Sequence, residues 1–243
     1  AMKGFPGKIG QTIETSIPYW PDRSVDSAQR PNIVTVLFDD TGWADFGCFG
    51  SEIRTPTIDA LAVRGLRYTN FHVTPLCSPT RAALFTGRNH HAIGMRCLAD
   101  TDTGFPNGRG SVPADIPMFP ALLRDRGYGT FLAGKWHLTP AHEVTAAGPF
   151  HNWPLARGFD RFYGLLGGCT DQYSPELCQD HHPFAPALHD DYHLSEDLCD
   201  RAITYLRDHI SLRGEDPFYL NLAFGATHAP LQVPRRYIEP YIS

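Results

Sequence analysis

The chain has 243 residues, and its 42% hydrophobic and 12% aromatic content suits a folded domain with a large core and excludes a disordered chain. Its formal net charge of −5 and the absence of a basic stripe argue against nucleic acid as the main partner. The sequence contains neither an apolar run of ~18 residues that would predict a membrane span nor the apolar core of a signal peptide. We therefore expect a cytoplasmic protein without a membrane partner, although the Ala1-Met2 beginning leaves room for a leader that was removed.

Six cysteines occur, at positions 48, 77, 97, 169, 178 and 199. Their spacing contains no C-x-x-C pair and is too sparse for a disulfide scaffold. We interpret all of them except Cys77 as ordinary thiols, with a disulfide as the alternative.

The chain divides into an arm and one larger unit. Residues 1–32 are rich in proline, glycine and polar side chains, which predicts an irregular arm laid over the rest, with Trp20 as an anchor. Residues 33–243 predict a single α/β unit.

This unit begins with IVTVLF at 33–38, an apolar, β-branched run that predicts a strand buried on both faces of a parallel sheet. Asp39 and Asp40 follow directly, where open α/β sheets bind ligands, and a solvated turn is the alternative. Residues 55–64 predict a helix, and residues 66–73 predict a second strand.

The second strand leads to a cysteine at a predicted helix start. Ser78 followed by Pro79 predicts a helix start, with Ser78 as the cap, Pro79 as the first helical residue and Cys77 just outside the N-terminus. Arg81 lies four residues after Cys77, so its guanidinium can reach the same helix end, where backbone N–H groups and the helix dipole favour an anion. The stretch predicts a site for a tetrahedral oxyanion, and a buried thiol at a helix cap is the alternative.

A pair of basic side chains follows the next predicted strand. Residues 100–113 form a polar loop of the kind that borders a pocket, and residues 119–126 predict a short helix. Residues 128–133 predict a strand that ends before Lys135 and His137. These two side chains can lie on the same face of an extended chain. The alternative is that both are solvent-exposed and have no functional role.

The last predicted elements again place a polar residue just after a strand. Residues 167–191 predict a loop, residues 195–210 predict an amphipathic helix with Ser195 as its N-cap, and residues 218–224 predict a strand that ends before His228. The predicted inner face of the helix consists of Leu198, Cys199, Ala202, Ile203, Leu206 and Ile210. Alternating strands and helices predict a doubly wound, mostly parallel sheet flanked by helices.

Several of these stretches resemble one enzyme family. Cys77-Ser78-Pro79-Thr80-Arg81, continuing as AALFTGR, resembles the C-x-P-x-R signature of type I sulfatases. The Asp-Asp pair at 39–40, GKWHL at 134–138 and the TH.PLQ pattern at 227–232 resemble further motifs of that family. The resemblance implies an alkaline phosphatase-like fold and the N-terminal portion of a larger, bacterial-type arylsulfatase. Such enzymes cleave (aryl) sulfate esters to an alcohol or phenol plus sulfate.

The resemblance also implies a modified nucleophile and a metal ion. Cys77 would be oxidised to formylglycine by a formylglycine-generating enzyme, and the hydrated aldehyde would attack sulfur. Asp39, Asp40 and the modified Cys77 would bind a divalent cation, with Ca²⁺ expected and Mg²⁺ as the alternative.

The same family pattern implies roles for four further side chains. Arg81 would hold the nucleophile and balance charge on the sulfuryl group, and Lys135 would contact the sulfate. His137 would contact the formylglycine hydrate and take a proton from it. His228 would bind the ester and help to protonate the departing alcohol.

The chain lacks some of the residues that the family pattern includes. The family supplies further metal ligands and a second substrate lysine from downstream sequence that this chain lacks, and calcium takes about six to eight ligands. We therefore expect a fragment that is inactive without the missing C-terminal part of the same enzyme. A phosphonate or phosphodiester hydrolase of the same superfamily is one alternative, although such enzymes resemble the chain less at Lys135 and His137. A non-catalytic fragment in which Cys77 stays a thiol is the other.

Overall fold

The computed structural model describes residues 4–20 and 30–242. Its centre is a six-stranded sheet in the order β1-β6-β2-β3-β4-β5. The strands are β1 (Ile33–Leu37), β2 (Gly129–Gly134), β3 (Arg161–Gly164), β4 (Leu177–Gln179), β5 (His182–Phe184) and β6 (Phe218–Ala223). Strands β1, β6, β2 and β3 run parallel, and β4 and β5 extend the sheet in antiparallel fashion.

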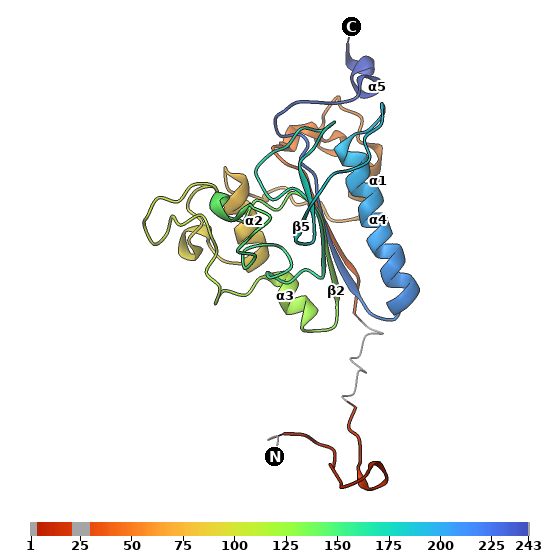
Figure 1. The fold of residues 1–243 in the computed structure, drawn as a ribbon. Coiled ribbons are helices and arrows are strands. Elements are labelled where there is room, and N and C mark those ends of the chain that lie inside the picture. The colour runs from red at the N-terminus through yellow and green to blue at the C-terminus, as the bar shows by residue number, and fades with distance from the viewer. Residues whose placement is uncertain (1–3, 21–29, 243) are drawn as a thin grey trace.

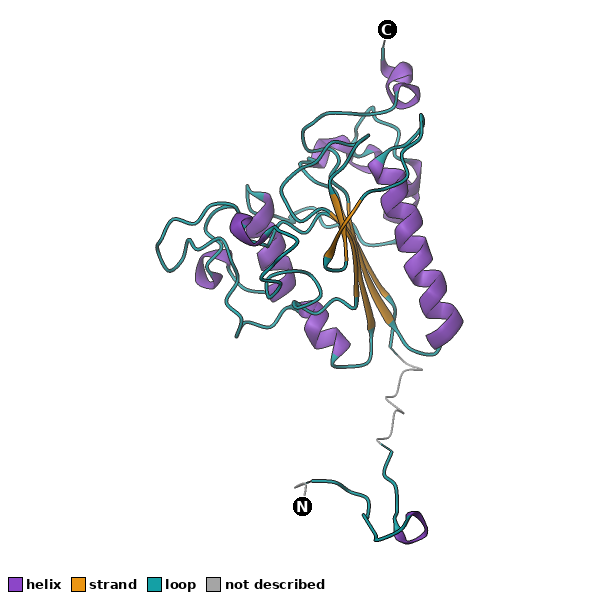
Figure 2. Cartoon of the chain, viewed as in Figure 1, coloured by secondary structure: helices purple, strands orange, loops and turns teal. Residues whose placement is uncertain are grey.

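Helices pack on both faces of this sheet (Figure 1 and Figure 2). Helices α2 (Cys77–Thr86) and α3 (Phe119–Arg124) lie on one face, and α4 (Leu194–Arg213) lies on the other. Side chains of β2 alternate between two cores: Leu132 packs with Phe85 of α2, whereas Phe131 packs with Leu198 of α4. The alternation confirms the predicted doubly wound, mostly parallel architecture. Two further helices are α1 (Pro56–Arg64) and α5 (Arg235–Ile238).

Two strand predictions are wrong. Strand β1 lies at the edge of the sheet and is not buried on both faces, because Val34 and Val36 are 53% and 45% exposed. Residues 66–73 form no strand, since no neighbouring strand among the described residues pairs with them. An apolar, β-branched composition specifies an extended chain but does not supply the partner that a sheet needs.

The inner face of α4 also differs from the prediction. Ile203 and Ile210 are exposed, and the residues that face the sheet include Tyr205 and His209. His209 can be buried because its Nε2 lies 2.9 Å from the Asp216 carbonyl oxygen. The N-cap is His193, not the predicted Ser195. In the segment predicted as a loop, β4 and β5 form a hairpin.

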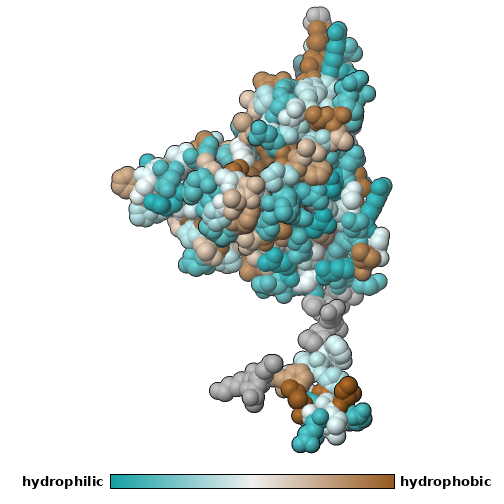
Figure 3. Space-filling model, viewed as in Figure 1, coloured by the Kyte–Doolittle hydropathy of each residue, from teal (hydrophilic) through white to brown (hydrophobic). Residues whose placement is uncertain are grey.

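The described part of the N-terminal arm, residues 4–20, lies apart from the sheet and is not laid over it (Figure 1). A backbone bridge between Lys8 and Ile17 closes it into a turn. Its apolar side chains face outward (Figure 3), and the predicted anchor Trp20 is 82% exposed. None of the helices in the described ranges is long and apolar enough to cross a lipid bilayer. All six cysteines are free thiols.

Candidate active site

The carboxyl ends of three neighbouring strands meet at one level of the sheet. Ala223 of β6 is in register with Leu37 of β1 and with Gly134 of β2. Gly134 has a φ of 118°, and a Cβ atom there would lie 1.8 Å from the Ala223 carbonyl oxygen. Only glycine therefore allows the strands to approach so closely. The predicted polar residues begin immediately beyond this level.

The loops after β1 and β6 are joined by backbone hydrogen bonds. The Asp39 N–H donates to the Ala226 carbonyl at 3.0 Å, and the Thr227 N–H donates to the Asp39 carbonyl at 2.7 Å. The Thr227 hydroxyl also lies 3.2 Å from the Asp40 carbonyl oxygen. These bonds fix the aspartate pair beside the segment that carries His228.

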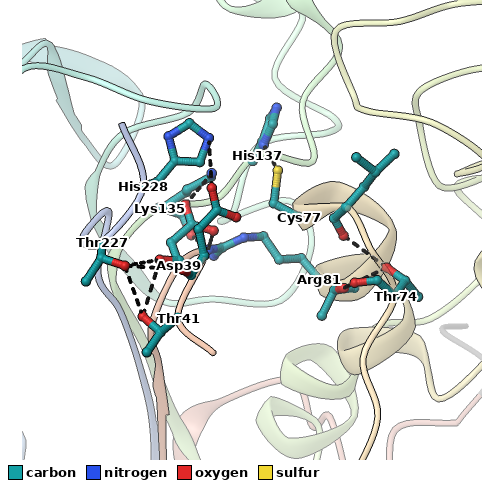
Figure 4. A network of polar contacts seen from close by, with 12 residues as sticks. Asp39, Thr41, Thr74, Cys77, Arg81, Lys135, His137, Thr227 and His228 are labelled. Carbon is teal, nitrogen blue, oxygen red and sulfur yellow. Dashed lines mark hydrogen bonds and ion pairs between the residues drawn. The ribbon is translucent and has the colours of Figure 1, made fainter. Parts of the chain in front are cut away.

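The centre of the site is a buried group of charges (Figure 4). Lys135 Nζ lies 2.5 Å from Asp39 Oδ2, and an Arg81 guanidinium nitrogen lies 3.5 Å from Asp39 Oδ1. Arg81 also donates to the Lys135 carbonyl at 2.7 Å, whereas its Nε has no hydrogen-bond partner in the described chain. Burial lowers the pKa of Arg81, and the nearby Asp39 opposes this effect. Two cations face one carboxylate, so the group carries a surplus positive charge that favours an anionic ligand.

Cys77 lies next to an imidazole. Its Sγ is 3.1 Å from Nδ1 of His137, whose side chain is almost fully buried. Burial, followed by the charge of Lys135, lowers the pKa of His137 to about 4, whereas Asp100 acts in the opposite direction. The ring is therefore neutral near pH 7, and an unprotonated Nδ1 can accept a proton from a group at position 77.

The start of α2 differs by two residues from the prediction. Cys77 is the first helical residue and Leu76 is the N-cap, so Ser78 does not cap the helix. Instead, the Ser78 hydroxyl accepts a hydrogen bond from the Ala99 N–H at 3.1 Å. Arg81 still lies one turn after Cys77, as predicted, and the helix ends before Gly87 in the left-handed conformation.

His228 and Asp40 form the more open side of the site. His228 Nε2 lies 3.7 Å from Asp40 Oδ2, and the Asp40 side chain is 62% exposed. In Figure 4, the Lys135 and Asp39 side chains lie between His228 and the Cys77–His137 pair. The seven predicted side chains thus gather at one edge of the sheet, on loops after three strands and on the first turn of α2.

The aspartate pair supplies only part of a cation shell. Both oxygens of Asp39 face cationic side chains, and Asp40 faces His228 and solvent. Within the described ranges, no group of three or more His, Cys, Asp or Glu side chains is arranged to hold a metal ion. Carboxylate oxygens suit Ca²⁺ or Mg²⁺, but a complete shell would need further oxygen ligands.

Two contributors to the site were not predicted. Asp100, in the polar loop after α2, lies 3.7 Å from His137 Nε2, and Thr227 joins the loops after β1 and β6. The polarity of residues 100–113 indicated a pocket border but did not single out one acid. Thr227 lies within the TH.PLQ pattern, where only the histidine had an expected role.

Comparisons with known proteins identify relatives of this chain. The sulfatase family model matches residues 31–243. Arylsulfatase J of Mus musculus is 31% identical over 242 residues, which cover 96% of this chain and 38% of that protein. Steryl-sulfatase of Homo sapiens is 44% identical over 143 residues, which cover 57% of this chain and 24% of that protein. The crystal structure of Ps i-CgsB in complex with k-i-k-neocarrahexaose matches with a TM-score of 0.72 and 30% identity, over 86% of this chain and 48% of that one.

The chain spans less than half the length of each of these relatives. The structural match extends over most of the chain and confirms the alkaline phosphatase-like fold that the resemblance implied. The family match includes every predicted site residue, from Asp39 to His228. The chain therefore belongs to the sulfatase family.

Proposed function

We propose that this chain carries the nucleophile, the general base and part of the metal site of a sulfuric ester hydrolase. Its substrate would be a small-molecule sulfate ester, such as an aryl sulfate, and its products would be sulfate and an alcohol or phenol. The observation that carries the proposal is the 3.1 Å approach of Cys77 Sγ to His137 Nδ1, beside a buried group with surplus positive charge. A nucleophile, its base and an anion-binding group are the parts that sulfuryl transfer requires.

The chemistry at position 77 depends on oxidation of the cysteine. Formylglycine, made from Cys77 by a formylglycine-generating enzyme, would add water to form a hydrate with two hydroxyls. One hydroxyl would attack sulfur and displace the alcohol, and the other would lose its proton to expel sulfate and restore the aldehyde. His137 would accept a proton at Nδ1, because its lowered pKa leaves the ring neutral near pH 7.

Arg81 and Lys135 would bind the sulfuryl oxygens. Their buried donors are fixed before the substrate arrives, so they stabilise developing negative charge without reorganisation. His228, on the more open side, would donate a proton to the departing alcohol oxygen. Asp39 and Asp40 would hold a divalent cation, Ca²⁺ or Mg²⁺, which would polarise a sulfate oxygen and lower the pKa of the attacking hydroxyl.

We further propose that the chain alone does not turn over sulfate esters. Two carboxylates cannot complete a calcium shell, and the exposed face of β1 at Val34 and Val36 offers an apolar surface for additional chain to cover. The downstream part of the same enzyme would then be its partner.

Mass spectrometry of the peptide that contains Cys77 tests the proposal first. Formylglycine would make this peptide lighter than the cysteine form by about the mass of a water molecule. A peptide that remains wholly unmodified after co-expression with a formylglycine-generating enzyme would favour the non-catalytic alternative.

Parallel assays with an aryl sulfate and an aryl phosphodiester, with calcium present, test the reaction. We expect turnover of the sulfate only when the downstream part of the enzyme is added. Preferential cleavage of the phosphodiester would instead favour the phosphodiester hydrolase alternative, and efficient turnover by the chain alone would contradict the need for a partner.

A further inference from the structure

The imidazole beside Cys77 has a second ring nitrogen without a hydrogen-bond partner. His137 Nε2 is buried, and no described residue hydrogen-bonds to it. Asp100 Oδ1 lies 3.7 Å away, slightly beyond hydrogen-bond distance. A buried ring N–H without an acceptor is costly, so this arrangement favours closure of the short remaining gap.

Gly168 covers the same edge of the imidazole. A Cβ atom on Gly168 would lie 2.8 Å from His137 Cε1 and 3.1 Å from Nε2, so the missing side chain allows the backbone to pack directly on the ring. Bulk water is therefore kept from Nε2 on this side. The acceptor nearest to this nitrogen is the Asp100 carboxylate, whose side chain is 55% exposed at the edge of the site.

The position of Asp100 relative to Cys77 is fixed by a hydrogen bond of the preceding residue, Ala99. The Ala99 N–H donates to the Ser78 hydroxyl at 3.1 Å, and both residues are buried. Ser78 directly follows Cys77 on the first turn of α2. Gly110 packs behind this segment, where a Cβ atom would lie 2.7 Å from the Ala99 carbonyl oxygen. One buried hydrogen bond thus fixes the backbone next to Asp100 relative to the backbone next to Cys77.

We propose that Asp100 is a positioning residue for His137. Its carboxylate accepts a hydrogen bond from Nε2–H, which keeps the ring proton on Nε2 and leaves the Nδ1 lone pair directed at the group on residue 77. When that group gives its proton to Nδ1, Asp100 stays ionised and stabilises the imidazolium that forms. This role rests on the proposed function for its catalytic meaning, whereas the proposed hydrogen bond does not require conversion of Cys77 and can be tested in the cysteine form.

Nitrogen-15 NMR of the purified chain, with Cys77 as the thiol, tests the hydrogen bond. The His137 signals are assigned from their loss in His137→Gln. At pH 7 we expect the neutral Nε2–H form, with a ring N–H that exchanges slowly with water. In Asp100→Ala this N–H should exchange about tenfold faster or more, as expected when a hydrogen bond of this kind is lost.

Two variants act as controls. Asp100→Asn keeps an acceptor oxygen and should preserve slow exchange. Asp102→Ala removes an acid from the same loop, one that pairs with Arg109 at 3.2 Å, and should leave the His137 signals unchanged. Asp100→Ser, whose hydroxyl is too short to reach Nε2, repeats the test should the alanine variant fail to fold.

Two results would overturn the proposal: a ring proton found on Nδ1 in the unaltered chain, or equally slow exchange in the unaltered chain and in Asp100→Ala. Neither result depends on sulfate hydrolysis. A protected Nε2–H in a chain that cleaves no sulfate ester even after conversion of Cys77 and addition of the downstream part of the enzyme would refute the proposed function alone. An unprotected one in a chain that is active under those conditions would refute only the role of Asp100.

Discussion

Replacing Lys135 by methionine removes one of the two cations that neutralise the buried Asp39. Lys135 is 1% exposed, and its Nζ lies 2.5 Å from the carboxylate, so the change leaves that carboxylate with Arg81 at 3.5 Å. Breaking a buried ion pair costs about 3–5 kcal/mol because one charge stays buried without its partner. Since Arg81 remains, we expect a loss near the lower limit, about 3 kcal/mol.

Urea unfolding of the purified chain, followed by circular dichroism, measures this loss. Arg213→Met is the matched control, because Arg213 pairs with Asp216 at 2.8 Å but the two side chains are 50% and 38% exposed. It should cost less than about 1 kcal/mol. The double variant Asp39→Asn/Lys135→Met should lose less stability than the two single variants summed. Equal losses for Lys135→Met and Arg213→Met would refute the reasoning.

Three further predictions concern the glycine at the end of β2, a half-buried thiol and the cation. Gly134→Ala should lower the free energy of unfolding by about 3 kcal/mol or more, because the new Cβ would meet the Ala223 carbonyl oxygen at 1.8 Å, and thermal unfolding measures it. Burial raises the pKa of the Cys178 thiol to about 11. Iodoacetamide at pH 9 should therefore modify the exposed Cys169 first, and Cys178 should react only as the pH approaches 11. Peptide mass spectrometry measures the labelling, and equal labelling of the two cysteines at pH 9 would contradict the prediction. Calorimetric titration should find calcium bound to the chain alone no more tightly than about 1 mM, since no group of three or more His, Cys, Asp or Glu ligands is assembled within residues 4–20 and 30–242. Micromolar binding would contradict the incomplete shell.

The sequence predicts the parts of this fold that local pattern determines. Apolar runs followed by polar residues correctly predicted the positions of β1, β2 and β6. The residues just beyond these strands, such as Asp39 and Lys135, lie together because parallel strands end at one edge of the sheet. Residues 66–73 have the same apolar character, but none of the described strands pairs with them. Pairing is a property of the whole chain, so composition alone could not separate these cases.

Contacts between distant residues account for the other differences. On α4, His209 is buried in place of the more apolar Ile210 because the Asp216 carbonyl oxygen and the rings of Phe131 and Phe218 surround it. The approach of Asp100 to His137 joins two loops that only the fold brings together. A pattern of hydrophobicity contains no information about such partners.

Because β1, β6 and β2 end at the same level, pairing of these strands out of register would separate the charged side chains of the site. A shift of β1 by one residue against β6 would displace Asp39 by about 3.3 Å and turn its side chain to the opposite face. When the shift puts Phe38 in the place of Asp39, Lys135 and Arg81 are left in the interior without that counter-charge. A sheet misaligned in this way would therefore be destabilised by charge as well as by shape. The side chains that are proposed to bind sulfate and the cation thus also favour the correct alignment of the strands.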